Sequence, residues 1–212
     1  MNNLHRFINL PFIVDRPHQF DTIKLPDLPN RGLTIKIEEN VIDKRILEWL
    51  GSYGITASKF YEASNTIPGG AVCVHLDTDQ LSDMTKFIIA WGPSNSGTRW
   101  WEPKKDAIPR YVTYWENGIE IEKLVQGDYK CELDKRGNKI VTDSYLGYEP
   151  EQCDLIYEKV LTYPSLINAG RLHSTFNHGN EDRWTISLTL LKDKNYLQFD
   201  EALEIFKDVI YE

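Results

Sequence analysis

Apolar and polar residues alternate along several short segments of the chain, as they do in half-buried β-strands. The clearest alternation covers residues 183–191, where the apolar positions are Trp184, Ile186, Leu188 and Leu190. Further strands are predicted at residues 57–63, 71–76, 85–91, 155–161, 165–168 and 172–176. Turn-forming residues separate these segments, which is typical of a β-rich fold.

Two segments show helical rather than strand spacing. The first has its apolar positions at Ile42, Ile46, Leu47, Trp49 and Leu50. Gly51 or Gly54 is placed to end this helix. The second predicted helix covers residues 200–211, with Asp200 as its N-cap. The first forty residues carry four prolines and are expected to form extended connecting chain.

The middle of the chain, residues 98–150, is rich in Trp and Tyr. Asn117-Gly118 and Arg136-Gly137-Asn138 are typical of hairpin turns, and short strands at this spacing favour a sandwich or barrel. We therefore predict a single, mainly β domain (1–212) with flanking helices. Its parts are an N-terminal extension and supporting helix (1–56), a β core (57–191) carrying an aromatic-rich insertion (98–150), and a C-terminal helix (192–212).

Composition limits the classes of partner. The 212 residues, 41% of them hydrophobic, suffice for one well-packed domain. A formal net charge of -8 argues against nucleic acid or an anionic membrane as partner. No segment approaches the roughly 20 apolar residues that cross a bilayer, and the N-terminus is unlike a signal peptide. We expect a cytoplasmic protein whose oligomeric state is open.

The three cysteines, Cys73, Cys131 and Cys153, include no closely spaced pair. Neither a disulfide framework nor a thiolate zinc site is indicated, and reduced thiols are the simplest account.

Candidate chemistry lies at the end of the predicted strand 71–76. His75 and Asp77 are two positions apart, so on a strand both side chains point to the same face. Ala71 and Cys73 would share that face, while Val72, Val74 and Leu76 would point the other way. One imidazole and one carboxylate on one face form a two-point grip for a metal ion. Alone, the pair also fits a capping role at a loop end.

A second pair flanks the turn-forming run Asn177-His178-Gly179-Asn180. A hairpin centred near His178 would place His173 and Arg183 opposite each other, roughly 5 Å apart. Two imidazoles and one carboxylate can occupy one face of an octahedral Fe(II). An arginine nearby could hold the far carboxylate of a short diacid that chelates the iron, and Thr185 shares its face. Alone, His173 also fits a hydrogen-bonded core histidine, and Arg183 a solvated residue.

The order His-x-Asp, a distant His, and an Arg ten residues beyond it resembles the Fe(II)/2-oxoglutarate-dependent dioxygenase superfamily. Within that superfamily the chain looks like small hydroxylases of the prolyl hydroxylase or aspartyl/asparaginyl β-hydroxylase type. Some of the latter lack the acidic ligand, whereas Asp77 is present, and Asp77 also argues against a halogenase.

The resemblance implies a double-stranded β-helix (jelly roll, cupin-like). It also implies His75, Asp77 and His173 as iron ligands, and Arg183 with Thr185 as binders of 2-oxoglutarate. The implied reaction uses O2 to hydroxylate an amino acid, peptide or small molecule, and succinate is the coproduct. Ascorbate could serve as a reductant. Two alternatives stay open: a non-catalytic jelly-roll binding protein, and a cupin-like metal protein without 2-oxoglutarate turnover.

Several residues fit either a substrate site or an ordinary structural role. The aromatic set comprises Trp91, Trp100, Trp101, Tyr111, Tyr114 and Trp115, and core packing is its simpler explanation. Arg99 could bind a substrate carboxylate or stack at the surface, and Asn95 and Thr98 are equally undecided. His178 fits a turn residue better than a metal ligand.

Overall fold

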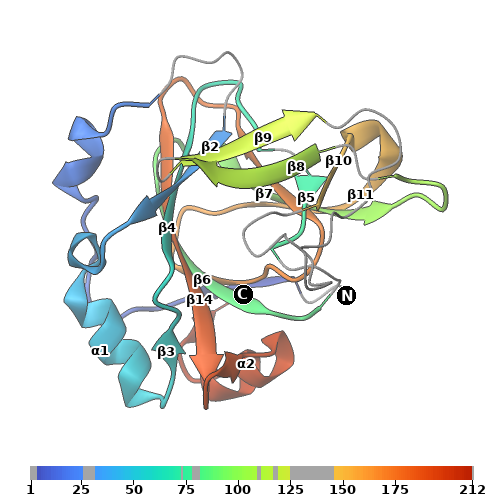
Figure 1. Cartoon of the computed structure of the whole chain (residues 1–212). Helices are drawn as coiled ribbons and strands as arrows, with labels where there is room; N and C mark the ends of the chain where they lie inside the picture. Colours follow the sequence, from blue (N-terminus) through green and yellow to red (C-terminus); the bar gives the residue numbers. More distant parts are fainter. Residues whose placement is uncertain are drawn as a thin grey trace, which may run out of the picture.

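The structure is a computed structural model that describes residues 4–25, 32–72, 74–77, 82–108, 111–116, 119–124 and 146–211. For residues 111–116, 119–124 and 146 it describes the backbone alone. The chain is mainly β, and its strands form antiparallel sheets (Figure 1). No helix in the described part of the chain is long and apolar enough to span a membrane.

The first sheet has the strand order β2-β4-β14-β6-β12-β1-β16, and its strand pairs are antiparallel. Its strands are β1 (His5–Ile8), β2 (Gly32–Ile37), β4 (Tyr61–Thr66), β6 (Thr85–Trp91), β12 (Ser165–Asn168), β14 (Arg183–Lys192) and β16 (Ile210–Tyr211). Two short strands, β3 (Thr56–Ala57) and β15 (Asn195–Tyr196), pair with the far end of β14. Strand β14 therefore lies inside this sheet, between β4 and β6.

The second sheet has the strand order β5-β13-β7-β11. Its strands are β5 (Val74–His75), β7 (Ser96–Pro103), β11 (Cys153–Val160) and β13 (His173–Asn177). Three further strands, β8 (Tyr111–Glu116), β9 (Ile119–Leu124) and β10 (Leu146–Tyr148), join the two sheets (Figure 1). This connection is hydrogen-bonded throughout, because β10 pairs with β5 and β9 pairs with β2.

The two faces of β14 separate the hydrophobic core from the polar interior. Its even-numbered residues, Trp184, Ile186, Leu188 and Leu190, belong to the largest apolar cluster. The helices α1 (Lys44–Ser52) and α2 (Phe199–Ile205) contribute Leu50 and Ala202 to the same cluster. The odd-numbered side chains of Arg183, Thr185 and Ser187 instead line a cavity on the other face of the sheet. Strand alternation thus sends polar groups inward and apolar groups toward the helices.

Most predicted strands are present, with small shifts at their ends. Strands β6 and β12 have the predicted bounds, and β14 exceeds the prediction by one residue. The prediction of one strand over residues 57–63 is wrong, because this segment contains the end of β3 and the start of β4. The first forty residues are not only connecting chain, since they contain β1 and β2. The turn at Asn117-Gly118 and the turn at residues 136–138 lie outside the described residues.

The first helix is confirmed, and the second is shorter than predicted. Asp43 caps α1 by accepting a hydrogen bond from the backbone of Arg45 at 3.0 Å, and Gly54, with φ +72°, follows the helix end. The prediction of a helix through residue 211 is wrong, because α2 ends at Ile205. The chain then pairs residues 210–211 with β1, which satisfies their backbone groups in the sheet instead.

Three 3-10 turns complete the described structure: η1 (His18–Thr22), η2 (Glu39–Val41) and η3 (Pro150–Gln152). Phe20 of η1 is buried and stacks on Trp184, with ring centroids 4.4 Å apart. This contact fixes the N-terminal chain over the apolar face of β14.

Two glycines allow a matched test of the fold. A Cβ at Gly97 would collide with the backbone carbonyl of Lys159, where β7 pairs with β11. A Cβ at Gly51, inside α1, would meet nothing within 4 Å. We expect Gly97→Ala to lower the free energy of unfolding by about 1–3 kcal/mol. Gly51→Ala should raise it by about 0.5–1 kcal/mol, as measured by urea denaturation. Equal effects of the two substitutions would contradict the β7–β11 register.

Candidate metal centre

The pairing of β13 with β5 brings two distant histidines together. His173 and His75 are direct partners in this antiparallel ladder, and their ring centroids lie 4.6 Å apart. Asp77 follows β5 at a bend, where the backbone is no longer strand. The pair His75 and Asp77 therefore converges because the chain bends after a two-residue strand, not because of parity along a long strand.

The predicted alternation before His75 holds only in part. Val74 and Leu76 pack in a separate apolar cluster, as predicted for the face opposite His75. Val72, however, lines the same cavity as His75, so its predicted orientation is wrong. The regular strand begins only at Val74, and parity cannot be extended to residues before it.

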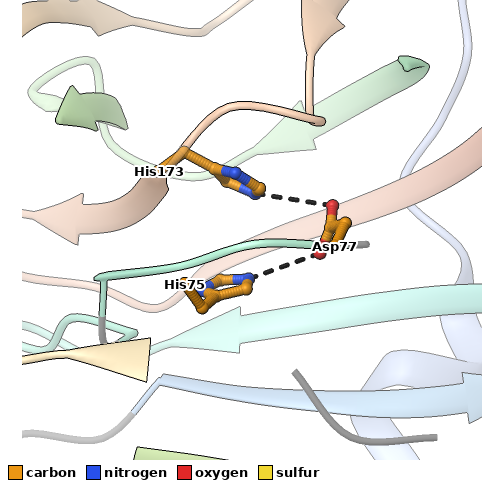
Figure 2. Close-up of side chains that lie close together, drawn as sticks. All are labelled: His75, Asp77 and His173. Atoms are coloured by element: carbon orange, nitrogen blue, oxygen red, sulfur yellow. Dashed lines mark ion pairs between the residues drawn. The ribbon is translucent and has the colours of Figure 1, made fainter. Parts of the chain in front are cut away.

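His75, Asp77 and His173 form a compact set of donors that could hold a metal ion. Figure 2 shows both imidazoles directed at the carboxylate of Asp77. His75 Nε2 lies 3.4 Å from Asp77 Oδ1, and His173 Nε2 lies 3.5 Å from Asp77 Oδ2. Donors bound to one ion at roughly 2.1 Å and right angles are about 3 Å apart, so small adjustments would suffice. Two imidazoles and a carboxylate suit iron, and they leave further coordination positions open.

His173 is held in the form that binds a metal. Its Nδ1 lies 2.8 Å from the carbonyl oxygen of Arg171, and an N–H at Nδ1 donates to that acceptor. Nε2 is then left with its lone pair facing Asp77. Burial lowers the pKa of His173 to about 4, so the ring is neutral at pH 7. A metal ion would not have to displace a proton from it.

A buried lysine adds positive charge beside the donors. Lys86 Nζ lies 2.9 Å from Asp77 Oδ2 and 2.8 Å from Glu62 Oε2. Burial alone would raise the pKa of Asp77, but Lys86 and the two imidazoles outweigh it and hold this pKa well below its usual range. Burial raises the pKa of Glu62 despite the charge of Lys86. The site therefore contains an ionised Asp77 at neutral pH.

The structure contradicts the predicted hairpin between His173 and Arg183. β13 pairs with β5 and β7, whereas β14 pairs with β4 and β6 in the first sheet. Residues 178–182 therefore cross from one sheet to the other. The two side chains still meet at one cavity, because each lies on the inner face of its own sheet.

Arg183 is a buried cation at the wall of this cavity. Its side chain is 2% exposed, and it forms no ion pair with any residue that the structure describes. Its Nε has no hydrogen-bond partner among those residues. Burial lowers its pKa to about 10, so the guanidinium stays charged at pH 7. A buried, uncompensated guanidinium is costly and would be stabilised by an anion.

The cavity joins the metal-binding residues to Arg183. Its volume is about 50 Å³, room for a few water molecules at roughly 10–15 Å³ each. Thr185 lines it next to Arg183, and other hydroxyl groups come from Thr34, Ser64, Thr98, Thr175 and Ser187. Such a cavity suits a compact, polar, anionic ligand.

Core packing is the predicted role of the aromatic set, and none of its described tryptophans lines this cavity. Trp100 is fully buried in an apolar cluster, where its Nε1 donates to the Asn168 carbonyl at 3.1 Å. Trp101 donates to Ser174 Oγ at 2.9 Å, and Trp91 donates to the Val14 carbonyl. For Tyr111, Tyr114 and Trp115 the structure describes the backbone alone. Core packing accounts for the described tryptophans.

Of the polar candidates, only Thr98 lines the cavity. Arg99 pairs with Glu158 at 2.5 Å, its Nη2 lies 3.0 Å from His178 Nε2, and it stacks over Phe176. Asn95 donates to the His178 carbonyl. These residues belong to the surface around the crossover between the sheets.

Sequence reasoning missed Lys86 and Glu62. Lys86 is the charged residue in the predicted strand 85–91, and Glu62 follows Phe60 and Tyr61 in the predicted strand 57–63. A charge within a largely apolar strand is a usable signal, because such a residue needs a buried partner. The sequence could not show that the two side chains meet, since that depends on how β4 and β6 flank β14.

Comparisons with known proteins give little further information. No family model and no curated protein matches the chain. The solved structure titled "X-Ray structure of E. coli ycfD" is 14% identical to the chain. The match covers 91% of this chain and has a TM-score of 0.31. The chain spans 43% of that structure's chain. A likeness this weak carries no argument about fold or function.

The depressed pKa of His173 predicts acid sensitivity of the metal-free protein. The unfolded chain takes up a proton on this histidine below about pH 6.5, whereas the folded protein does so only near pH 4. The free energy of unfolding should therefore fall as the pH is lowered from 6.5 to 4. His5, whose pKa burial also lowers to about 4, acts in the same direction. Urea denaturation at several pH values measures this slope.

The raised pKa of Glu62 acts in the opposite direction, so the comparison between variants is the test. His173→Gln should therefore reduce the slope between pH 6.5 and 4.5 relative to the unsubstituted protein. An unchanged slope in His173→Gln would show that the folded protein protonates this residue as easily as the unfolded chain does.

Proposed function

We propose that the protein is an Fe(II)- and 2-oxoglutarate-dependent dioxygenase that hydroxylates an amino acid, a peptide or a small molecule. The observation that carries this proposal is the meeting of His75, Asp77 and His173 at one small cavity with the buried Arg183, which has no ion pair within the described part of the chain. A metal-binding triad alone would fit many metalloproteins. A cation with no partner beside it fits a site for a diacid whose other end reaches the metal.

The strand order supports a double-stranded β-helix as the fold of the core. Strands β4, β14, β6 and β12 form one four-stranded unit, and β5, β13, β7 and β11 form the other. In chain order, β4, β5, β6 and β7 belong alternately to the first and the second unit, β7 is followed by β11 within the second unit, and β11, β12, β13 and β14 alternate again. This regular alternation is what a chain wound as a double helix of strands requires.

Each residue of the site has a role that its position supports. His75, Asp77 and His173 would hold the iron, which supplies the oxidative chemistry when it is bound with 2-oxoglutarate and O2. Arg183 would bind the far carboxylate of 2-oxoglutarate, and Thr185 on the same face would add a hydrogen bond. The buried walls would exclude bulk water from the reacting groups.

A small cavity favours a second candidate, a metal-binding protein of this fold without 2-oxoglutarate turnover. The interior volume of about 50 Å³ admits a diacid only if lining side chains adjust. The two functions differ in one measurable product, because only the dioxygenase converts 2-oxoglutarate to succinate.

Succinate formation is the direct test of the proposed activity. Purified protein with Fe(II), ascorbate, O2 and 2-oxoglutarate should release succinate, slowly if no substrate is present. His75→Ala should abolish this release, because it removes an iron ligand. Metal binding without any succinate, even with candidate peptide and amino-acid substrates, would favour the second candidate.

Arg183→Met should weaken 2-oxoglutarate binding while leaving metal binding intact. Removing one partner of a buried charge pair costs about 2–5 kcal/mol, which corresponds to a loss of affinity of more than tenfold. Calorimetric titration of 2-oxoglutarate into the Mn²⁺-loaded protein measures this loss, and Arg45→Met on α1 is the matched control. If Arg183→Met abolishes metal binding and spares 2-oxoglutarate, the assigned roles are wrong.

A further inference from the structure

Lys86 brings a buried ammonium group into direct contact with one of the three metal-binding side chains. It lies in β6, and its Nζ contacts Asp77 Oδ2 at 2.9 Å and Glu62 Oε2 at 2.8 Å. The side chains of all three residues are at most 7% exposed. Burying a charge is costly unless it is paired, so the trio is a built arrangement rather than a chance surface contact.

The carboxylate of Asp77 offers both of its oxygens to the site. Oδ1 lies 3.4 Å from His75 Nε2, and Oδ2 lies 3.5 Å from His173 Nε2. An ion among these donors could therefore bind one oxygen or both. A carboxylate bound through both oxygens would occupy two of six positions on an octahedral ion and leave only two open. Bound through one oxygen, it leaves three open.

Lys86 distinguishes between the two oxygens. Its ammonium forms an ion pair with Oδ2, and this positive charge competes with metal bonding at that oxygen and leaves Oδ1 as the better donor. Glu62 holds the ammonium from β4 on the other side, so Lys86 cannot easily swing away from Asp77. The arrangement resembles the second-layer hydrogen bonds that orient ligands in many metal sites.

We propose that Lys86, held by Glu62, is a positioning residue that restricts Asp77 to one metal-bound oxygen. The proposal rests on the metal centre of the proposed function and adds a role for two residues outside the donor set. A chelating 2-oxo acid needs two open positions and O2 needs a third. The ammonium thus keeps the third position free.

This role differs from a merely structural one in its effect on metal affinity. An ammonium beside a divalent cation repels it, so removing Lys86 relieves that repulsion and frees a second oxygen for the metal. Lys86→Met should therefore bind Mn²⁺ at least as tightly as the unsubstituted protein. A lysine that only supported the local structure would give weaker binding when replaced.

The number of waters on bound Mn²⁺ is the decisive measurement. Water-proton relaxation with Mn²⁺ as the probe should report three exchangeable waters in the unsubstituted protein and two in Lys86→Met, a fall of about one third. Lys86→Met leaves Glu62 buried without its partner and could unfold. The double variant Glu62→Met/Lys86→Met removes both charges with side chains of similar size and should show the same fall.

Two controls isolate the ion pair between Lys86 and Oδ2 of Asp77. Glu62→Gln keeps a partner for Lys86 and should retain three waters, and Lys192→Met, at a surface ion pair with Glu201, should do so as well. Three waters in both Lys86 variants would overturn the proposal. A loss of Mn²⁺ affinity of more than tenfold in both of them would also overturn it.

The outcome separates this role from the proposed activity. If Mn²⁺ binds through His75, as shown by its loss in His75→Ala, but no succinate forms, the dioxygenase assignment fails. The role of Lys86 is then decided by the number of waters on bound Mn²⁺ alone. If the unsubstituted protein binds no Mn²⁺, both proposals are wrong.

Discussion

The antiparallel pairing of β13 with β5 is the constraint on which the site depends. It sets His173 directly opposite His75, although the two residues are far apart in the sequence. The bend after β5 then turns Asp77 back toward both imidazoles. Without this pairing, the chain would contain a His-x-Asp segment and a separate histidine, and neither would bind a metal ion well.

The second requirement is a polar interior inside a β-rich fold. Strand β14 meets this requirement by directing its apolar residues to the helices and its polar residues to the cavity. The cavity then contains buried charges of both signs: Asp77 and Glu62 share the ammonium of Lys86, while Arg183 has no acidic partner in the described part of the chain. Buried charges cost stability, so their concentration at one cavity points to function rather than to folding.

Local patterns predicted much of this structure. Alternation located β6, β12 and β14 almost to the residue, and helical spacing located α1. His75, Asp77, His173 and Arg183, which meet at the cavity, were also recognised from their chemistry. Their arrangement was not, because the turn-forming run after Asn177 is equally compatible with a hairpin and with a crossover between sheets. The sheet pairing that decides between them is a long-range property.

Charged residues inside strands were the second feature of the site that the sequence could not predict. Lys86 and Glu62 have no motif, and their meaning depends on β4 and β6 both pairing with β14, which places the two side chains within reach of each other. The shortened helix α2 has the same cause, because pairing of the last residues with β1 outweighs a helical pattern. In each case a tertiary contact overrides what the local sequence favours.

The central claim is that iron and 2-oxoglutarate bind together at His75, Asp77, His173 and Arg183. The most direct test is the visible absorption spectrum of the protein with Fe(II) and 2-oxoglutarate under strict anaerobiosis. The account predicts a weak charge-transfer band that requires both additions and disappears in His75→Ala. Protein that binds Fe(II) but develops no such band at saturating 2-oxoglutarate would contradict it.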